Sequence, residues 1–299
     1  MRALVTGASG LIGKRLARRL LADGIEVVAV ARDVAPLGAQ LPGARALAWD
    51  GVRLPADALD EVDWIFHLAG EPVAEGRWTE ERKARIRDSR VLSTRSIVAA
   101  LAANPRPSRV LVCASAVGIY GDRGDEPLTE RSAAGEGFLA ETCAAWEAAA
   151  APAAARARVV LLRTGIVLAR EGGALPRMAL PFRLLAGGPI GDGAFWQPWI
   201  HLADEVGMIL WALGEERAEG PLDATAPAPL RNRELAAALG EALHRPAFLP
   251  APALAVRLAL GELADAVTAS QRVLPEKALA LGYRFRFPEA GPALHDLLR

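Results

Sequence analysis

The sequence predicts an α/β fold in which a doubly wound parallel sheet is followed by a smaller C-terminal α/β region. Three observations predict it. The apolar residues Leu4 and Val5 run into closely spaced glycines, short apolar runs then alternate with helical periodicity, and after Gly172 glycine and proline become frequent while the alternation weakens. We therefore expect one domain over residues 1–170 and a second region over residues 171–299, with room for some of its segments to return to the sheet.

The composition limits the classes of function. With 299 residues, 52% of them hydrophobic, the chain is long enough for a sizeable core. Lys+Arg and Asp+Glu both number 35, so no net charge attracts nucleic acid or an anionic membrane surface. No apolar run approaches the length of a membrane span, and glycines interrupt the N-terminal segment that would otherwise resemble a signal peptide. We expect a cytoplasmic protein that acts on a small molecule, and the possibility of a homo-oligomer stays open.

Only two cysteines are present. Cys113 follows a strand-like apolar run, Cys143 lies in an alanine-rich helical segment, and neither has metal-ligand spacing. We expect buried, reduced thiols and no metal site.

The first turn is suited to holding a diphosphate. Gly7, Gly10 and Gly13 stand between an apolar strand and the start of a helix in which Leu16 and Leu20 recur at helical spacing. A helix N-terminus offers unpaired N–H groups and a positive dipole end, and glycines let an anion approach that backbone closely. The turn therefore predicts a dinucleotide site.

The end of the second strand predicts which dinucleotide is held. The strand over residues 26–30 ends at Ala31-Arg32, where a carboxylate would accept from a ribose 2′-OH but an arginine pairs with a 2′-phosphate. Asp33 lies one residue beyond the arginine. We therefore expect NADP(H), with NAD(H) less favoured. Asp50, after a short third strand, is a candidate acceptor for the adenine amine or a solvated loop acid.

Two later strands bring polar residues to the same sheet edge. Residues 64–70 read as a buried strand in which His67 has a structural role, and residues 110–115 as a strand that delivers Ser115. Tyr120 follows in the next loop. Arg163, inside the apolar strand over residues 159–163, needs a carboxylate partner, for which Glu147 is the candidate.

Further motifs follow in a fixed order: His67-Leu68-Ala69-Gly70-Glu71-Pro72, Arg77-Trp78-Thr79, Asp88-Ser89-Arg90, Leu162-Arg163-Thr164-Gly165-Ile166-Val167, Gly187-Gly188-Pro189-Ile190-Gly191, Trp199-Ile200-His201 and Gln271-Arg272-Val273. Together they resemble the extended short-chain dehydrogenase/reductase superfamily. The resemblance is closer to its atypical NAD-dependent epimerase-like branch, which includes bacterial epimerase family proteins and their animal relatives, and it covers nearly the whole chain.

This resemblance implies a Rossmann core, a C-terminal substrate domain and a bound nicotinamide dinucleotide, but no particular substrate. Carried over position by position, it implies cofactor contacts at Gly7, Ser9, Gly10, Leu11, Ile12, Gly13, Arg32, Leu68, Ala69, Gly70, Arg90 and Val167.

The catalytic pattern of the superfamily is absent. Its members use a tyrosine whose pKa is lowered by a lysine four residues later, yet Tyr120 and Tyr283 are the only tyrosines here and neither has that lysine. Aligned on Glu147, the two positions hold Leu139 and Cys143. Two hypotheses follow: an oxidoreductase or epimerase-like enzyme that uses Ser115 and Tyr120, or a non-catalytic NADP(H)-dependent sensor or scaffold.

Overall fold

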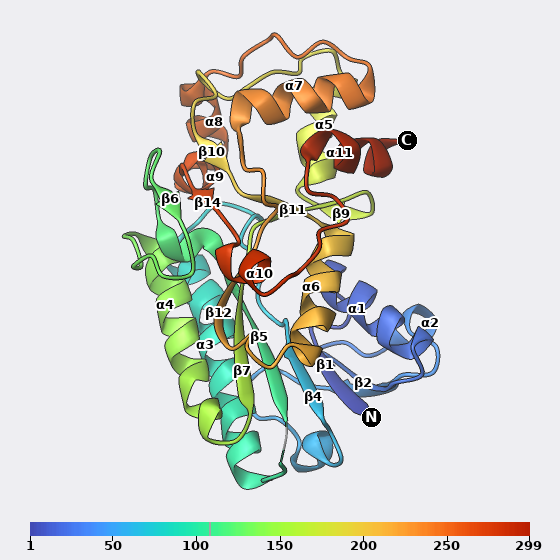
Figure 1. Cartoon of the computed structure of the whole chain (residues 1–299). Coiled ribbons are helices and arrows are strands. Elements are labelled where there is room, and N and C mark those ends of the chain that lie inside the picture. The colour runs from blue at the N-terminus through green and yellow to red at the C-terminus, as the bar shows by residue number, and fades with distance from the viewer. Residues whose placement is uncertain (108) are drawn as a thin grey trace.

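The computed structural model describes residues 1–107 and 109–299, and its centre is a seven-stranded sheet in which every pairing is parallel (Figure 1). The strands lie in the order β12 (Gly220–Ala224), β7 (Arg158–Thr164), β5 (Val110–Ala116), β4 (Trp64–His67), β1 (Arg2–Thr6), β2 (Glu26–Ala31) and β3 (Arg45–Ala48). The order reverses between β1 and β4. Ligands of open α/β sheets bind at such a reversal, beyond the carboxyl ends of the strands.

Helices cover both faces of this sheet (Figure 1). One face packs against α1 (Leu11–Ala22), α2 (Leu37–Gln40) and α6 (Leu202–Gly214), and the other against α3 (Glu80–Ala103) and α4 (Phe138–Ala150). Successive residues of a strand point to opposite faces, so Ala3 and Val5 join the first core and Leu4 joins the second. Both faces are buried, which explains the near-continuous apolar strands. The predicted doubly wound parallel sheet is confirmed.

A smaller α/β region follows. Its helices are α5 (Leu175–Arg183), α7 (Asn232–Leu243), α8 (Ala253–Leu260), α9 (Leu263–Thr268), α10 (Glu276–Ala280) and α11 (Ala290–Leu298). Its short strands are β8 (Ile166–Ala169), β9 (Gly172–Gly173), β10 (Trp196–Gln197), β11 (Trp199–His201), β13 (Leu230–Arg231) and β14 (Arg272–Val273), the last paired with β6 (Pro127–Leu128). Outside this region, the described residues also form the short 3₁₀ helices η1 (Ala56–Leu59), η2 (Val117–Tyr120) and η3 (Ala151–Ala155). A separate apolar core joins α5, α7 and α11.

The chain returns to the large sheet after it has entered the smaller region. Strand β12 and helix α6 both lie beyond residue 170. Even so, β12 pairs with β7 and α6 packs against α1. The exact boundary between the two domains stays a prediction. Within residues 1–107 and 109–299, no helix is both long enough and apolar enough to cross a membrane.

Candidate functional site

The turn after β1 requires glycine at two of its positions. Gly7 has a φ of +67°, and a Cβ there would lie 2.8 Å from the carbonyl oxygen of Leu68. A Cβ on Gly13 would lie 2.3 Å from the carbonyl oxygen of Gly7, which is closer than real Cβ atoms approach. The N–H of Gly10 donates to that same carbonyl at 2.9 Å. Strand, turn and helix therefore meet more closely than any side chain allows.

The N-terminus of α1 is open to an anion. Gly10 is the N-cap residue, no side chain caps the helix, and its first turn contains no acidic residue. Ser9 is exposed beside it, Leu11 and Ile12 are half-buried, and the Leu11 methyl groups lie close to the β8–β9 hairpin. Unpaired N–H groups, a positive dipole end and the missing Cβ atoms fit the diphosphate of a dinucleotide.

The end of β4 is held rigidly beside this turn. The Thr6 hydroxyl oxygen accepts from the N–H groups of Leu68 and Ala69 at 3.1 and 3.2 Å, and lies 2.8 Å from Nδ1 of His67. His67 is fully buried, and its Nε2 also contacts the hydroxyl of Thr94 at 3.0 Å. Burial lowers the pKa of His67 to about 4. The imidazole is thus a neutral, structural group, as expected.

Arg90 approaches the same strand end from α3. Its Nη1 donates to the carbonyl oxygens of Glu71 and Ile86 at 3.0 and 2.9 Å, and its guanidinium lies 5.1 Å from the ring of Trp146. A Cβ on Gly70 would lie 3.2 Å from Cζ of Arg90, so the missing side chain at Gly70 leaves room for the guanidinium. Burial lowers the pKa of Arg90.

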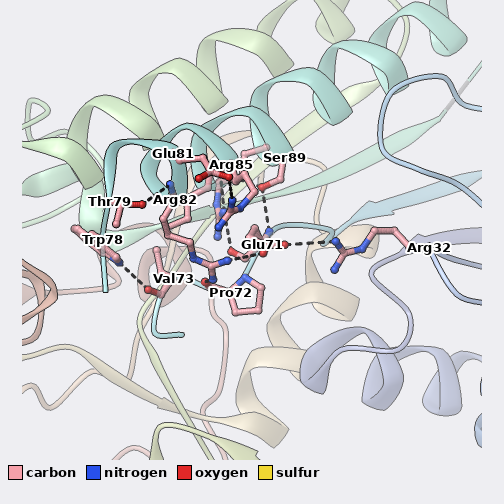
Figure 2. A network of polar contacts seen from close by, with 12 residues as sticks. Arg32, Glu71, Pro72, Val73, Trp78, Thr79, Glu81, Arg82, Arg85 and Ser89 are labelled. Carbon is pink, nitrogen blue, oxygen red and sulfur yellow. Dashed lines mark hydrogen bonds and ion pairs between the residues drawn. The ribbon is translucent and has the colours of Figure 1, made fainter. Parts of the chain in front are cut away.

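A carboxylate at the start of the next loop joins two arginines from different elements. Figure 2 shows Glu71 between Arg82 on α3 and Arg32 at the end of β2. Its Oε1 accepts from Arg82 at 2.6 Å, whereas its Oε2 lies 3.5 Å from Nη1 of Arg32. The Arg82 side chain is 12% exposed and the Arg32 side chain 77% exposed. Glu71 is therefore held firmly by Arg82 and only loosely by Arg32.

Beside Arg32 the surface is hollowed. A depression of about 500 Å³ lies past the ends of β2 and β3, lined by Arg32, Ala48, Trp49, Asp50 and Arg53. The glycine turn, Leu68, Ala69, Gly70 and Arg90 gather at the sheet reversal, while Arg32 stands at this depression. Gly173 lies close to both Val167, on β8, and Leu11, the first residue of α1 after the turn. A Cβ added to Gly173 would be 3.1 Å from a Leu11 methyl group and 3.5 Å from the Val167 carbonyl oxygen.

Ser115 and Tyr120 lie in a different, internal network at the carboxyl ends of β5, β7 and β12. The Ser115 hydroxyl donates to Glu147 at 2.7 Å, and Glu147 accepts from Arg163 through both oxygens at 2.9 Å. Arg163 also donates to the Tyr120 hydroxyl at 2.9 Å, while that hydroxyl lies 2.8 Å from Oδ1 of Asp223. The strand register places Ser115, Arg163 and Asp223 side by side. The predicted partnership of Arg163 with Glu147 is confirmed.

The chemistry of this network is that of a closed, buried cluster. Tyr120 is fully buried and Ser115 is 4% exposed. Burial and the neighbouring Asp223 carboxylate raise the pKa of Tyr120, and burial and Glu130 raise that of Asp223. The sequence analysis did not identify Asp223 as part of this network, although a carboxylate within an apolar strand could have indicated it. A proton-transfer role for Ser115 or Tyr120 stays a prediction.

The sequence alignment on Glu147 predicts Leu139 and Cys143 at the positions of the superfamily's tyrosine and lysine. Leu139 and Cys143 lie against the η2 turn, where a Cβ added to Gly118 would be 3.3 Å from Cβ of Leu139 and 3.9 Å from Sγ of Cys143. Both cysteines are buried and free, as expected, and burial raises the pKa of Cys113 to about 12 and that of Cys143 to about 11. In the described residues, no group of three or more His, Cys, Asp or Glu side chains could hold a metal ion.

One carboxyl group is buried on the opposite side of β7. Glu205, in the first turn of α6, accepts a hydrogen bond from the Thr164 hydroxyl through Oε1 at 2.8 Å, and its buried Oε2 has no partner in the described part of the chain. Burial raises the pKa of Glu205 to about 8, partly offset by the Thr164 bond. The carboxyl group is therefore largely protonated at neutral pH.

A parallel sheet that reverses beside a glycine turn and an uncapped helix defines a protein of the Rossmann class. Comparison with known proteins gives the family. Residues 3–223 match the model of the NAD dependent epimerase/dehydratase family, and residues 251–297 match a domain of unknown function, DUF1731. The chain belongs to the NAD dependent epimerase/dehydratase family.

Individual relatives agree over the full length. The chain is 37% identical to Epimerase family protein SDR39U1 homolog, chloroplastic, from Arabidopsis thaliana, over 100% of this chain and 87% of the relative. It is 37% identical to human Epimerase family protein SDR39U1 over 100% of both chains. The crystal structure of the human protein with NADPH superposes with a TM-score of 0.89 at 35% identity, covering 100% of this chain and 99% of that one.

Proposed function

We propose that this protein binds NADP(H), with NAD(H) as the weaker ligand. The observation that carries the proposal is the exposed Arg32 guanidinium beside a hollow at the end of β2, next to a glycine turn that fits a diphosphate. The human relative crystallised with NADPH supports it. The first turn of α1 would hold the diphosphate, and Arg32 would pair with the 2′-phosphate.

Titration of the apo protein with NADPH and NADH tests this proposal. We expect NADPH to bind more tightly than NADH, and Arg32→Ala to reduce that preference. Equal affinities, or a preference that Arg32→Ala leaves unchanged, would contradict the role of Arg32.

We further propose an oxidoreductase or epimerase-like activity on a small molecule. The bound dinucleotide would supply hydride transfer, while the protein supplies binding, orientation and a proton. Ser115 and Tyr120 are the proposed polar groups because Ser115 lies at the carboxyl end of the central strand β5 and Tyr120 lies in the η2 turn that follows it. Carbonyl compounds and nucleotide sugars are the substrate classes to screen. The cytoplasmic location expected from the sequence stays a prediction, since the Arabidopsis relative is named as chloroplastic.

Turnover is tested with a Ser115→Ala/Tyr120→Phe double variant and the matched control Tyr283→Phe. The proposal expects a large loss of rate in the double variant alone. An unchanged rate would remove both residues from the mechanism.

A second candidate function is a non-catalytic NADP(H)-dependent sensor or scaffold. It is favoured by the buried bonds of Ser115 and Tyr120 and by the apolar Leu139 and Cys143 in place of the catalytic pair. This hypothesis expects a partner protein to be captured only when NADPH is present and no redox change of NADPH with any substrate class. Affinity capture with and without NADPH, read beside the turnover screen, distinguishes the two functions.

A further inference from the structure

We propose that Arg53 is a second guanidinium for the 2′-phosphate of NADP(H), acting from the loop after β3, the strand that neighbours β2. The inference rests on the proposed cofactor and concerns the same subsite. Arg32 ends β2, Arg53 follows β3, and both side chains line the depression of about 500 Å³ beyond these strands. The sequence motifs predicted only Arg32 as a partner of the 2′-phosphate.

The backbone holds Arg53 in place on both sides. Asp50 Oδ1 accepts from the N–H groups of Val52 and Arg53 at 2.8 and 3.4 Å, so the chain turns sharply where β3 ends. Gly51 has a φ of +91° within that turn. One residue later, Leu54 is buried and its N–H donates to Ser96 Oγ on α3 at 2.8 Å. Arg53 is thereby presented to the depression by a fixed loop.

The charges around the depression suit a dianion. Of the described residues that line it, only Asp50 carries a carboxylate, and its Oδ1 already accepts the two N–H groups of the turn. Among the described residues, Arg53 has no acidic partner within 4.0 Å, and Arg32 has only the 3.5 Å contact with Glu71, which Arg82 already holds. A phosphate monoester carries a charge of about −1.5 to −2 at pH 7, which two guanidinium groups balance.

A neighbouring arginine shows the contrast. Arg45, at the start of β3, is also exposed, but it pairs with Asp57 at 2.5 Å and does not line the depression. Within the described residues, Arg45 thus has an acidic partner, whereas Arg53 has none within 4.0 Å. Arg45→Ala is therefore the matched control for Arg53→Ala.

The experiment measures binding of two probes that differ only by the 2′-phosphate, adenosine 2′,5′-bisphosphate and adenosine 5′-monophosphate, by titration calorimetry on the full chain. For Arg53→Ala we expect about five- to tenfold weaker binding of the bisphosphate, the loss typical of one charge-assisted contact at an open site. Binding of the monophosphate should stay within about twofold. Arg53→Lys should fall between the two proteins, and Arg45→Ala should match the unmodified chain.

The outcomes distinguish a failure of the Arg53 role from a failure of the proposed NADP(H) binding. If the unmodified chain prefers the bisphosphate and Arg53→Ala weakens both probes equally, or neither, the role of Arg53 is wrong while NADP(H) binding stands. If the unmodified chain shows no preference and binds neither NADPH nor NADH, the proposed cofactor fails and this inference fails with it. A selective loss in Arg53→Ala supports it, and loss of all preference in the Arg32→Ala/Arg53→Ala double variant supports a shared phosphate.

Discussion

Replacing Glu205 by glutamine should remove a strong pH dependence of stability. The carboxyl pKa is about 8 in the folded protein and 4.5 in the reference state, so the folded chain binds the proton more tightly. The contribution to stability is therefore fully present below pH 4.5 and is lost as the pH rises toward 8. Between pH 5 and pH 9 this difference amounts to about 4 kcal/mol. Glutamine can keep the bond from Thr164 but cannot ionise.

Thermal unfolding followed by circular dichroism at pH 5, 6, 7, 8 and 9 provides the assay. For a chain of 299 residues, 4 kcal/mol corresponds to about 6 °C in Tm. The difference in Tm between Glu205→Gln and the unmodified protein should thus rise by about 6 °C between pH 5 and pH 9, in favour of the variant. Glu241→Gln, an exposed change on α7, controls for the loss of a carboxylate. Parallel pH profiles for the unmodified protein and Glu205→Gln would refute a protonated buried Glu205.

Three further predictions concern the site. Gly13→Ala places a Cβ 2.3 Å from a turn carbonyl, so NADPH binding measured by fluorescence should weaken more than about tenfold, while Gly38→Ala, which meets nothing within 4 Å, should not change it. The folded-state pKa of His67, about 4, predicts that its NMR titration midpoint lies well below 6.5 and that up to about 3 kcal/mol of stability is lost as the pH falls from 6.5 to 4; a midpoint near 6.5 would contradict this. Glu147→Ala leaves Arg163 buried and unpaired, so urea unfolding should show a loss of about 3 kcal/mol, and a loss below about 1 kcal/mol would argue that water replaces the carboxylate.

The sequence predicted the fold well because its signals are local. The apolar runs of β1, β2 and β4 and the glycine turn each reflect a short-range requirement of backbone geometry or burial. The place of β12 was not predictable in the same way. Pairing of β12 with β7 joins segments separated by two helices and several short strands, and no local pattern encodes that neighbour.

The site was predicted in part for a similar reason. The glycine turn and Arg32 have positions that a motif fixes. The partners Glu71 and Asp223 depend on which strands become neighbours, so their roles appear only in the structure. The sequence predicted that Ser115 ends a strand and that Tyr120 follows in the next loop, but it gave no sign that their hydroxyl groups would bond to internal carboxylates.

The position of β12 in the sequence, far beyond its neighbour β7, also limits which fragments of the protein can be expressed. A fragment that stops at residue 170 would expose the whole edge of β7, whose backbone pairs with Gly220–Ala224, and would leave Tyr120 and Arg163 without Asp223. Such an edge recruits other chains. During synthesis, β7 must wait for more than fifty further residues before its neighbour leaves the ribosome. The large sheet is therefore complete only once residues 171–224 have been made, and a fragment that ends at residue 170 is not a natural unit for separate expression.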